Sequence, residues 1–344
     1  MKKPKRILVL RTDRLGDVIL STPVIRNLRL AYPNAYIAFL CRPYTRQALE
    51  GNPCLDEIIE YDKYGKHKSF FSTLRFSLWL KAKHFDWAIV LHPTNRVNMI
   101  AFLAGIPLRV GFNRKMGCLL NKKIVHKKQQ GKKHESEYTL DVLRHIGVDI
   151  KDKKLYFPVT DTAREAVGRL LILEGLDPEK KLLVVHPSAS CPSKRWSQDN
   201  FSQVIKVLKS ANPGLEVAVI TSIAERKFGA RLVEENEVVD LRGKLSLTEV
   251  GALLERASLL ISNDSGPVHI AAALETPVIA IFGRSDPGLS PLRWRPLGEK
   301  SRYLHKDVGC KQCLAHNCDK NFLCLKAIAP AEVCELAQKL LSLD

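Results

Sequence analysis

Short runs of apolar, β-branched residues alternate with longer amphipathic segments along the whole chain. In the first half, runs with the length and composition of strands lie at residues 6–11, 35–41, 57–62, 87–92 and 109–112. Between them, the spacing of apolar residues predicts helices near residues 17–31, 44–50, 68–83 and 96–104. Strands that alternate with helices in this way are typical of a parallel sheet covered on both faces.

The second half repeats the alternation, with strands predicted at 182–188, 216–221, 238–243, 259–264 and 277–283 and helices near 197–210, 224–236, 246–257 and 267–274. Two sets of about five strands exceed what one sheet usually carries, so we predict an α/β chain with two doubly wound domains. We place an N-terminal domain at 1–155, a linker and helix at 156–180, a C-terminal domain at 181–330 and a last helix at 331–344. Ligands of such sheets bind beyond the carboxyl ends of the strands, so we expect the site in a cleft between the domains.

The positive charge of the chain is concentrated in its N-terminal half. The net charge over 344 residues is +18, and residues 1–150 hold 27 Lys and Arg against 12 Asp and Glu. Part of the excess lies in residues 113–137, a polar and weakly periodic stretch that we expect to be a long surface loop. Such a charge suits nucleic acid, an anionic membrane surface or a polyanionic substrate, and it does not distinguish among them.

The compartment is indicated by the start of the chain and by its cysteines. The basic start leads directly into the strand-length run RILVLR, and no apolar run is long enough to span a membrane, so we expect a cytoplasmic protein. Nine cysteines, an odd number, favour thiols or a metal site over a disulfide framework. Four lie in CKQCLAHNCDKNFLC, namely Cys310, Cys313, Cys318 and Cys324. The first pair has zinc-ligand spacing and the second pair is wider, so a structural zinc and buried thiols both remain open.

The first motif with candidate chemistry, RTDRLGDVILSTPVIRNLRLAYP, follows the first strand. Gly16 allows a tight turn, and Asp17 lies at the start of the amphipathic helix that follows. An aspartate there serves either as a helix-terminal charge or, at the mouth of a cleft, as a general base. The segment contains no GxGxxG pattern, which gives dinucleotide binding little support.

Two motifs of the second half favour an anion site. In HPSASCPSKRW, small and hydroxyl residues such as Ser188 and Ser190 allow the backbone to approach a ligand, and Lys194 supplies a cation before the next helix. In LLISNDSGPVHIAAALETPVIAIFG, the pattern predicts strand, helix and strand, with Pro267 in the first helical turn and a cap at Gly266 or Ser265. Both loops leave carboxyl ends of strands, so both can face one phosphate. A capped helix with solvated basic residues, a capping Asp264 and a core His269 are the structural alternatives.

The segment KHKSFFSTLRFSLWLKAKHF, residues 66–85, mixes aromatic and basic residues. It fits a helix packed on the core between two strands, and it also fits a segment that docks at a membrane interface.

Together these motifs carry a resemblance. The start RTDRLGDVILSTPVIRNL, AGIPLRVGF at 104–112, HESE at 134–137, HPSASCPSKRW and NDSGPVHIAAAL followed by PVIAIFG resemble, in order, the bacterial lipopolysaccharide heptosyltransferases of glycosyltransferase family 9. The resemblance implies a GT-B fold of two Rossmann-like domains facing a cleft. It also implies an ADP-heptose donor on the C-terminal domain and a lipid-linked lipopolysaccharide core acceptor on the N-terminal one.

The resemblance also implies residue roles. Asp17 would be the general base and Lys194 the cation on the donor diphosphate. The remaining donor-binding residues would be Ser188, Ser190, Glu225, Asp264, Ser265, Gly266 and His269. Ser265 stands where relatives often have Thr, a change that keeps the hydroxyl, and TSIAERK around Glu225 departs from the usual Gly- and Glu-rich form.

Basic residues of the N-terminal half fit the acidic sugars and phosphates of such an acceptor and the inner-membrane surface that carries it. The candidates lie at strand ends and loops: Arg11, Arg14, Arg96, Arg114, Lys115, Lys122 and Lys123. An inverting transfer needs a base and positive charge on the leaving diphosphate, and no Asp-x-Asp pair is present, so we expect neither a metal nor a cofactor. We further expect a monomer, attached peripherally to the inner membrane, that binds no nucleic acid. A nucleotide-sugar epimerase, a transferase with another donor and a basic nucleic-acid-binding protein are the alternatives.

Overall fold

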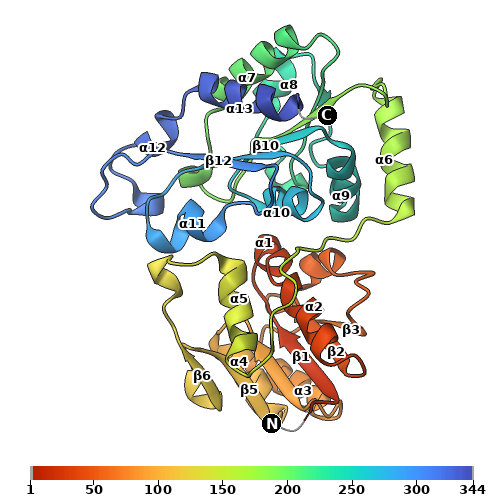
Figure 1. Ribbon diagram of the computed structural model, residues 1–344, viewed down its shortest axis with the longest axis vertical. Coiled ribbons are helices and arrows are strands. Elements are labelled where there is room, and N and C mark those ends of the chain that lie inside the picture. The colour runs from red at the N-terminus through yellow and green to blue at the C-terminus, as the bar shows by residue number, and fades with distance from the viewer. Residues whose placement is uncertain (1–2, 343–344) are drawn as a thin grey trace. The chain divides into compact units, whose positions relative to one another are not determined.

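The computed structural model describes residues 3–342, and these form two compact units. Unit 1 comprises residues up to Pro158 except 130–132, and unit 2 comprises residues 130–132 and those from Val159 onward. Each unit is a six-stranded parallel sheet with helices on both faces (Figure 1).

Unit 1 has the strand order β3-β2-β1-β4-β5-β6. Its strands are β1 (Arg6–Leu10), β2 (Tyr36–Cys41), β3 (Glu57–Glu60), β4 (Trp87–Val90), β5 (Leu108–Asn113) and β6 (Lys122–Val125). Its helices are α1 (Leu15–Ile19), α2 (Thr22–Ala31), α3 (Phe70–Lys81), α4 (Asn95–Leu103) and α5 (Glu135–Arg144). The five predicted strands are confirmed. The predicted helix at 17–31 is broken into α1 and α2, and residues 43–48 form a 3-10 turn where 44–50 was expected to be helical.

Unit 2 has the order β12-β11-β10-β7-β8-β9. Its strands are β7 (Leu182–His186), β8 (Glu216–Val219), β9 (Val239–Asp240), β10 (Leu259–Asn263), β11 (Val278–Phe282) and β12 (Ser301–His305). Its helices are α6 (Asp161–Leu173), α7 (Gln198–Ala211), α8 (Ala230–Glu235), α9 (Leu247–Arg256), α10 (Gly266–Ala273), α11 (Pro291–Trp294), α12 (Leu323–Lys326) and α13 (Pro330–Leu341). Numbered within each unit, the two sheets share the order 3-2-1-4-5-6.

Each sheet contains one strand that the sequence analysis missed. The expected surface loop at 113–137 is wrong in part, because residues 122–125 pair in parallel with β5 as the edge strand β6. Residues 301–305 likewise pair with β11 as the edge strand β12. Both segments mix charged or polar residues with apolar ones and none of their residues is buried, so they lack the apolar run that marks a central strand.

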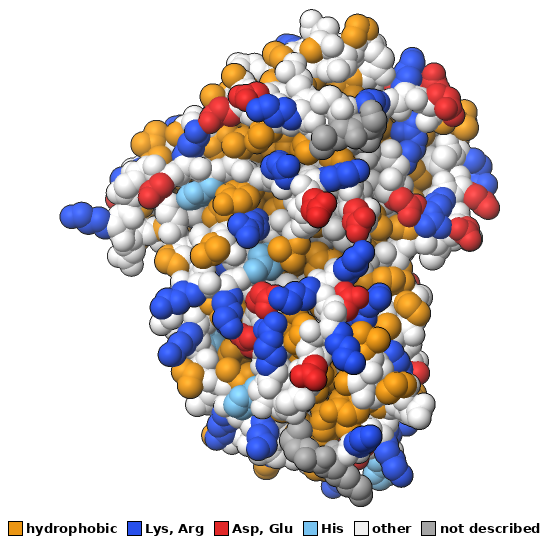
Figure 2. Space-filling view, in the orientation of Figure 1, with side chains coloured by type: hydrophobic (Ala, Val, Ile, Leu, Met, Phe, Trp, Pro, Cys, Tyr) orange, Lys and Arg blue, Asp and Glu red, His pale blue; other side chains and the backbone are white. Residues whose placement is uncertain are grey.

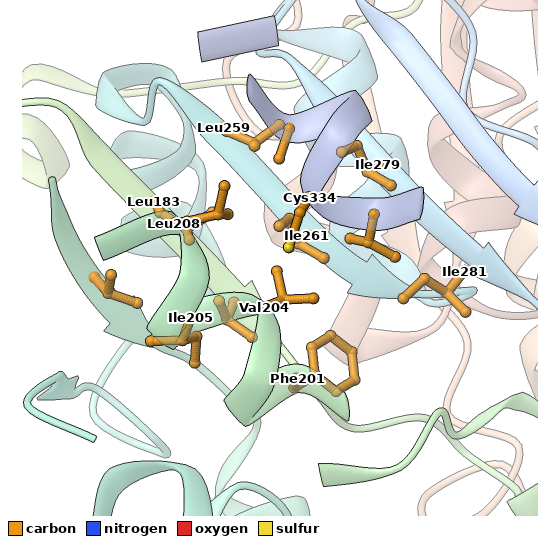
Figure 3. Close-up of a cluster of buried hydrophobic side chains, with 14 of the residues drawn as sticks. Leu183, Phe201, Val204, Ile205, Leu208, Leu259, Ile261, Ile279, Ile281 and Cys334 are labelled. Carbon is orange, nitrogen blue, oxygen red and sulfur yellow. The ribbon is translucent and has the colours of Figure 1, made fainter. Parts of the chain in front are cut away.

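The cores explain why the central strands are apolar throughout. In unit 2, one face of the sheet packs Leu183, Ile261 and Ile279 against α7 and α13 (Figure 3). In unit 1, Leu8, Leu10 and Leu40 pack with side chains of α3 and α4. Burial on both faces removes the alternation of apolar and polar residues that a one-sided sheet would show.

The strand order fixes where each unit offers a crevice. In a sheet of order 3-2-1-4-5-6, the chain leaves strands 1 and 4 toward opposite faces, and ligands bind at the carboxyl ends of that pair. The pair is β1 and β4 in unit 1 and β7 and β10 in unit 2. The motifs around Asp17, Lys194 and Asp264 follow three of these four strands.

Candidate functional site

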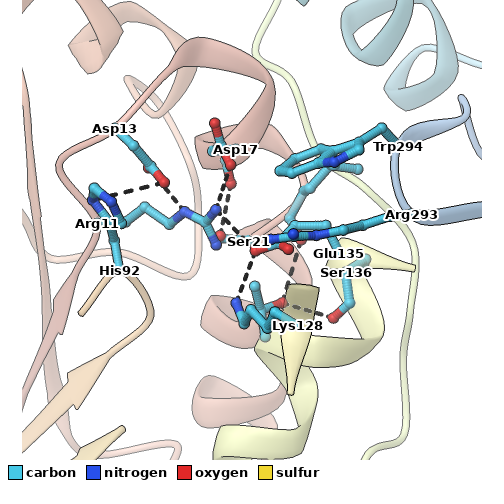
Figure 4. A network of polar contacts seen from close by, with 12 residues as sticks. Arg11, Asp13, Asp17, Ser21, His92, Lys128, Glu135, Ser136, Arg293 and Trp294 are labelled. Atoms are coloured by element: carbon cyan, nitrogen blue, oxygen red, sulfur yellow. Dashed lines mark hydrogen bonds and ion pairs between the residues drawn. The ribbon is translucent and has the colours of Figure 1, made fainter. Parts of the chain in front are cut away.

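Three carboxylates of unit 1 share one buried guanidinium at the carboxyl end of β1 (Figure 4). Arg11 donates from Nε to Asp13 Oδ1 at 2.9 Å, and from Nη2 to Asp17 Oδ1 at 2.5 Å and to Glu135 Oε1 at 3.0 Å. The ammonium of Lys128 also donates to Glu135 Oε1, at 2.8 Å. Arg11 therefore holds the β1–α1 loop and the first turn of α5 around Asp17.

The environment of Asp17 suits a general base. Its side chain is 13% exposed, so a substrate hydroxyl can reach it while most of the carboxylate is desolvated. This burial and the negative charge of Asp13 raise the pKa of Asp17 to about 7, against the opposing effect of Arg11. A base whose pKa lies near neutral combines a useful fraction of the ionised form with a strong affinity for the proton.

His92 is a member of this group that the sequence analysis did not single out. It follows β4, the neighbour of β1, and its Nδ1 lies 3.7 Å from Asp13 Oδ2. Burial and the positive charge of Arg11 lower the pKa of His92 to about 4, so the imidazole is neutral at physiological pH. Its position at the end of strand 4 of the sheet was the signal that could have marked it.

In unit 2, two cations meet one carboxylate at the end of β10. The Lys194 ammonium lies 2.6 Å from Asp264 Oδ2, and the guanidinium of Arg284 lies 3.7 Å from the same oxygen. Lys194 Nζ also donates to the backbone carbonyl of Asp264, at 3.2 Å. All three side chains are at most 14% exposed, and together they carry a net positive charge. Arg284, which follows β11, was missed because its motif offers no pattern beyond a strand end.

A chain of polar side chains lies at the end of β7. Ser188 Oγ bonds His186 Nε2 at 3.0 Å and donates to Glu225 Oε2, also at 3.0 Å. Ser265 Oγ lies 3.1 Å from His186 Nδ1. The structure thus brings together Ser188, Glu225 and Ser265 through His186, a residue that the sequence analysis did not propose. Burial lowers the pKa of His186 to about 4 and keeps it neutral.

The two loops of unit 2 are tied together by a buried amide. Asn263 accepts from the Trp196 backbone N–H at 3.0 Å and donates to the Pro187 carbonyl at 2.7 Å. This pair of bonds fixes both ends of the 187–196 loop, which carries Ser188 and Lys194, against β10. The expectation that both loops lie at the same end of one sheet is confirmed.

The helix start at α10 has the predicted form. Ser265 is the N-cap, Gly266 begins the helix and Pro267 lies in its first turn. His269 follows within the same turn and is buried. Ser190, in contrast, is exposed on the 187–196 loop.

The basic residues expected to meet an acceptor divide into two groups. Arg11 is 2% exposed and donates to three carboxylates through Nε and Nη2, so the expectation of a direct acceptor contact is corrected to a role in holding Asp17. Arg96 donates to the backbone carbonyls of Lys63, His67 and Lys68 and so braces a loop. The others are exposed on the loop after β1 and around β5 and β6, namely Arg14, Arg114, Lys115, Lys122 and Lys123. Over the face drawn in Figure 2, blue Lys and Arg side chains cover much of unit 1 with few acidic ones between them.

The four cysteines of the CKQCLAHNCDKNFLC motif line one pocket of unit 2, together with Ser193 and Arg284. Within residues 3–342, no three side chains of the His, Cys, Asp and Glu types are arranged to hold a metal ion. The four thiols are partly accessible rather than buried. Burial raises the pKa of Cys324, and the neighbouring Cys313 and Cys318 raise it further.

Among the helices of residues 3–342, none has the length and apolar character needed to cross a bilayer.

Comparison with known proteins gives consistent matches along nearly the whole chain. The model of "Glycosyltransferase family 9 (heptosyltransferase)" matches residues 73–323. Lipopolysaccharide heptosyltransferase 3 of Escherichia coli K12 is 28% identical, over 96% of this chain and 96% of that protein.

Two solved structures share the fold. The glycosyl transferase family 9 structure from Veillonella parvula superposes with a TM-score of 0.88 at 26% identity, covering 98% of this chain and 97% of the other. The structure of E. coli ADP-heptose lps heptosyltransferase II has a TM-score of 0.79 at 24% identity, covering 98% of each chain. The α/β class of two Rossmann-like domains, expected from the resemblance to GT-B enzymes, is confirmed.

Proposed function

Since the chain belongs to glycosyltransferase family 9, we propose that it transfers heptose from ADP-heptose to a sugar of the lipopolysaccharide core. Two related proteins support the substrates: the E. coli relative is named for heptosyl transfer to lipopolysaccharide, and the solved E. coli enzyme is named for ADP-heptose. Residues 1–155 would bind the acceptor and residues 181–330 the donor.

The reaction we propose is a single displacement that inverts the anomeric centre. The acceptor hydroxyl oxygen forms a bond to C1 of the heptose as the bond from C1 to the diphosphate oxygen breaks and ADP leaves. Asp17 takes the proton of the hydroxyl. The observation that carries this role is the position of Asp17 just after β1, where its side chain is 13% exposed and is held by Arg11 at 2.5 Å. Burial raises the pKa of this carboxylate to about 7, which suits a base.

The donor site follows from the charges at β7 and β10. Asp264 holds two cations, Lys194 and Arg284, so the cluster keeps a net positive charge for an entering diphosphate. Lys194 would turn from Asp264 toward the phosphate oxygens and stabilise the departing ADP. The hydroxyls of Ser188 and Ser265 and the carboxylate of Glu225 would face the sugar and ribose hydroxyls, with Ser190, Gly266 and His269 completing the phosphate loop.

These groups supply the base and the positive charge that stabilises the leaving group, and we therefore propose transfer without a metal ion. Activity should be unchanged by EDTA. Loss of activity in EDTA that Mg²⁺ restores would contradict metal independence.

We also propose that the enzyme is a monomer at the cytoplasmic face of the inner membrane. Light scattering should give the mass of one chain.

Transfer assays with ADP-heptose and purified truncated core test the base. We expect Asp17→Asn to lower kcat by about 10²- to 10⁴-fold while the ADP-heptose Kd from calorimetry changes little, because the base acts only in the chemical step. Wild-type kcat/KM should fall as pH drops through 7, since protonated Asp17 cannot accept a proton. Asp161→Asn, an exposed aspartate on α6, is the matched control.

A second pair of variants tests the donor site. Lys194→Met should weaken donor binding at least tenfold, whereas Lys206→Met, at an exposed lysine on α7, should not. Full turnover by Asp17→Asn, or an unchanged donor Kd in Lys194→Met, would refute the corresponding role. Tighter binding of a uridine sugar than of ADP-heptose would overturn the donor, and turnover of the donor with no acceptor present would point to an epimerase.

A further inference from the structure

The segment from Lys63 to Phe85 leaves large apolar side chains in solvent. Tyr64, Phe70, Phe71, Leu78 and Trp79 are each between 47% and 78% exposed. The segment contains six Lys and Arg and no Asp or Glu. Exposed apolar groups scattered singly need no explanation, but five within one short segment with charge of one sign do.

The geometry of α3 shows why these side chains point outward. Thr73, Phe76, Ser77 and Leu80 face the sheet and are buried, so the core already has its contacts from this helix. Phe71, Arg75 and Leu78 follow one another at spacings of four and three residues and form the opposite stripe. Both sequence-based interpretations of residues 66–85 are thus compatible, since one side of α3 packs on the core and the other is unpartnered.

The exposed side consists of aromatic, leucine and basic residues, which we call the α3 face: Tyr64, Lys66, Lys68, Phe70, Phe71, Arg75, Leu78, Trp79 and Lys81. Within residues 3–342, its four cations make no ion pair. Two other lysines of the segment are engaged elsewhere, since Lys83 pairs with Glu57 at 2.6 Å and Lys63 donates to the Thr12 carbonyl at 2.9 Å. The α3 face therefore presents apolar groups surrounded by uncompensated positive charge.

The α3 face begins at the carboxyl ends of the strands, where Asp17 also lies. β3 ends at Glu60 and α3 begins at Phe70, so the connecting loop lies at the carboxyl ends of the parallel strands. The bond from Lys63 to Thr12 joins that loop to the segment that carries Asp13 and Asp17. Arg96 braces the loop from α4 through the carbonyls of Lys63, His67 and Lys68.

We propose that the α3 face docks on the surface of an anionic lipid bilayer. The rings and Leu78 would enter the headgroup region, and Lys66, Lys68, Arg75 and Lys81 would lie against lipid phosphates. The occupant is a bilayer rather than a second copy of the chain, because two such faces would place four cations against four with no acid between them. The role of this docking rests on the proposed function: it would hold a lipid-linked acceptor at the carboxyl ends of the strands of unit 1, where Asp17 lies.

Vesicle binding tests the surface directly. We compare sedimentation of the full chain with vesicles of phosphatidylethanolamine containing about one third phosphatidylglycerol and with vesicles of phosphatidylcholine alone. The anionic vesicles should bind at least tenfold more tightly. Phe71→Ser with Leu78→Ser, and separately Lys66→Glu with Lys68→Glu, should each weaken that binding at least tenfold. Leu173→Ser on α6 alters an exposed leucine of unit 2, is the matched control and should bind like the wild type.

Stability, ADP affinity and activity on two forms of the acceptor distinguish a loss of docking from a loss of folding or of catalysis. The variants should keep the wild-type Tm and ADP affinity, because none of the altered side chains is buried. They should lose activity on acceptor embedded in vesicles and keep it on a delipidated core oligosaccharide. Equal binding of wild type and variants, or no preference for anionic vesicles, would overturn the docking surface, as would a dimer that the serine variants dissociate. Vesicle binding without heptose transfer to any acceptor would leave the surface standing and refute the proposed function.

Discussion

At the scale of single residues, the two candidate sites use buried charge in opposite ways. Around Asp17, three carboxylates share Arg11, so burial and mutual repulsion hold the proton affinity of Asp17 high. Around Asp264, two cations share one carboxylate, which leaves positive charge in place for an anion. The first arrangement suits proton abstraction and the second suits a leaving diphosphate.

The raised pKa of Asp17 makes a prediction about stability. The folded-state pKa, about 7, lies above the ordinary value of 3.8, so folding disfavours the ionised form. This destabilisation is absent below pH 3.8 and grows as pH rises toward and through 7. Asp17→Asn should therefore raise the Tm relative to wild type more at pH 8 than at pH 5, measured by calorimetry in matched buffers. A Tm difference between Asp17→Asn and wild type that is the same at both pH values would contradict the raised pKa.

At the scale of elements, the position of Lys194 depends on how closely β11 approaches the turn that carries it. Gly283 directly follows β11, and a methyl group at its Cα would lie 2.4 Å from the carbonyl oxygen of Ser193. No atom at that distance can be accommodated without a shift of the 192–194 turn. The small residue at 283 thus lets the backbone of the 187–196 loop pack against the strand end.

We expect Gly283→Ala to displace Lys194 and to weaken ADP-heptose binding by about tenfold, equivalent to about 1.4 kcal/mol. Gly214→Ala is the control, because a Cβ there would meet no atom within 4 Å. Calorimetric titration of both variants with ADP-heptose, together with their Tm values, checks the prediction. If Gly283→Ala binds the donor as tightly as Gly214→Ala, the close approach does not position the lysine.

The central strands could be predicted from the sequence, whereas two edge strands could not. Central strands were predictable because burial on both faces makes them continuous apolar runs, as at Leu259–Asn263. The edge strands Lys122–Val125 and Ser301–His305 were not, because one edge of each faces solvent and each mixes charged or polar residues with apolar ones. Asp17, Lys194 and Asp264 were found because each follows a predicted strand within a recognisable motif.

Contacts between distant segments were not predictable. Arg11 was expected at the acceptor because it ends a strand, yet its partner Glu135 lies 124 residues away, and no local pattern joins them. His186 ends β7 and Arg284 follows β11, but their partners Ser265 and Asp264 lie on another loop that no local pattern joins to them. Local patterns therefore located the carboxyl ends of the strands as the place of the candidate sites. The side-chain pairs that form there could be identified only from the structure.

At the scale of the whole molecule, the two units share one strand order but differ in net charge. Both units reverse their strand order between strands 1 and 4, and each places a neutral histidine at the carboxyl ends of that pair, His92 in unit 1 and His186 in unit 2. The charge is divided unequally, since residues 1–150 hold 27 Lys and Arg against 12 Asp and Glu. Lys194 and Arg284 of unit 2, which we propose bind the donor, are at most 14% exposed, whereas the basic residues around β5 and β6 of unit 1 are exposed.

This difference predicts how salt affects the two substrates. Raising NaCl from about 0.1 M to about 1 M shortens the screening length from about 10 Å to about 3 Å, and exposed charges lose far more attraction than buried ones. We expect the KM for the phosphorylated core acceptor to rise several-fold, while the ADP Kd, set at side chains at most 14% exposed, rises less. Initial rates and calorimetry across the salt series measure both, with sucrose as an uncharged control solute. Parallel rises in the two constants would mean that the exposed basic residues around β5 and β6 do not attract the acceptor.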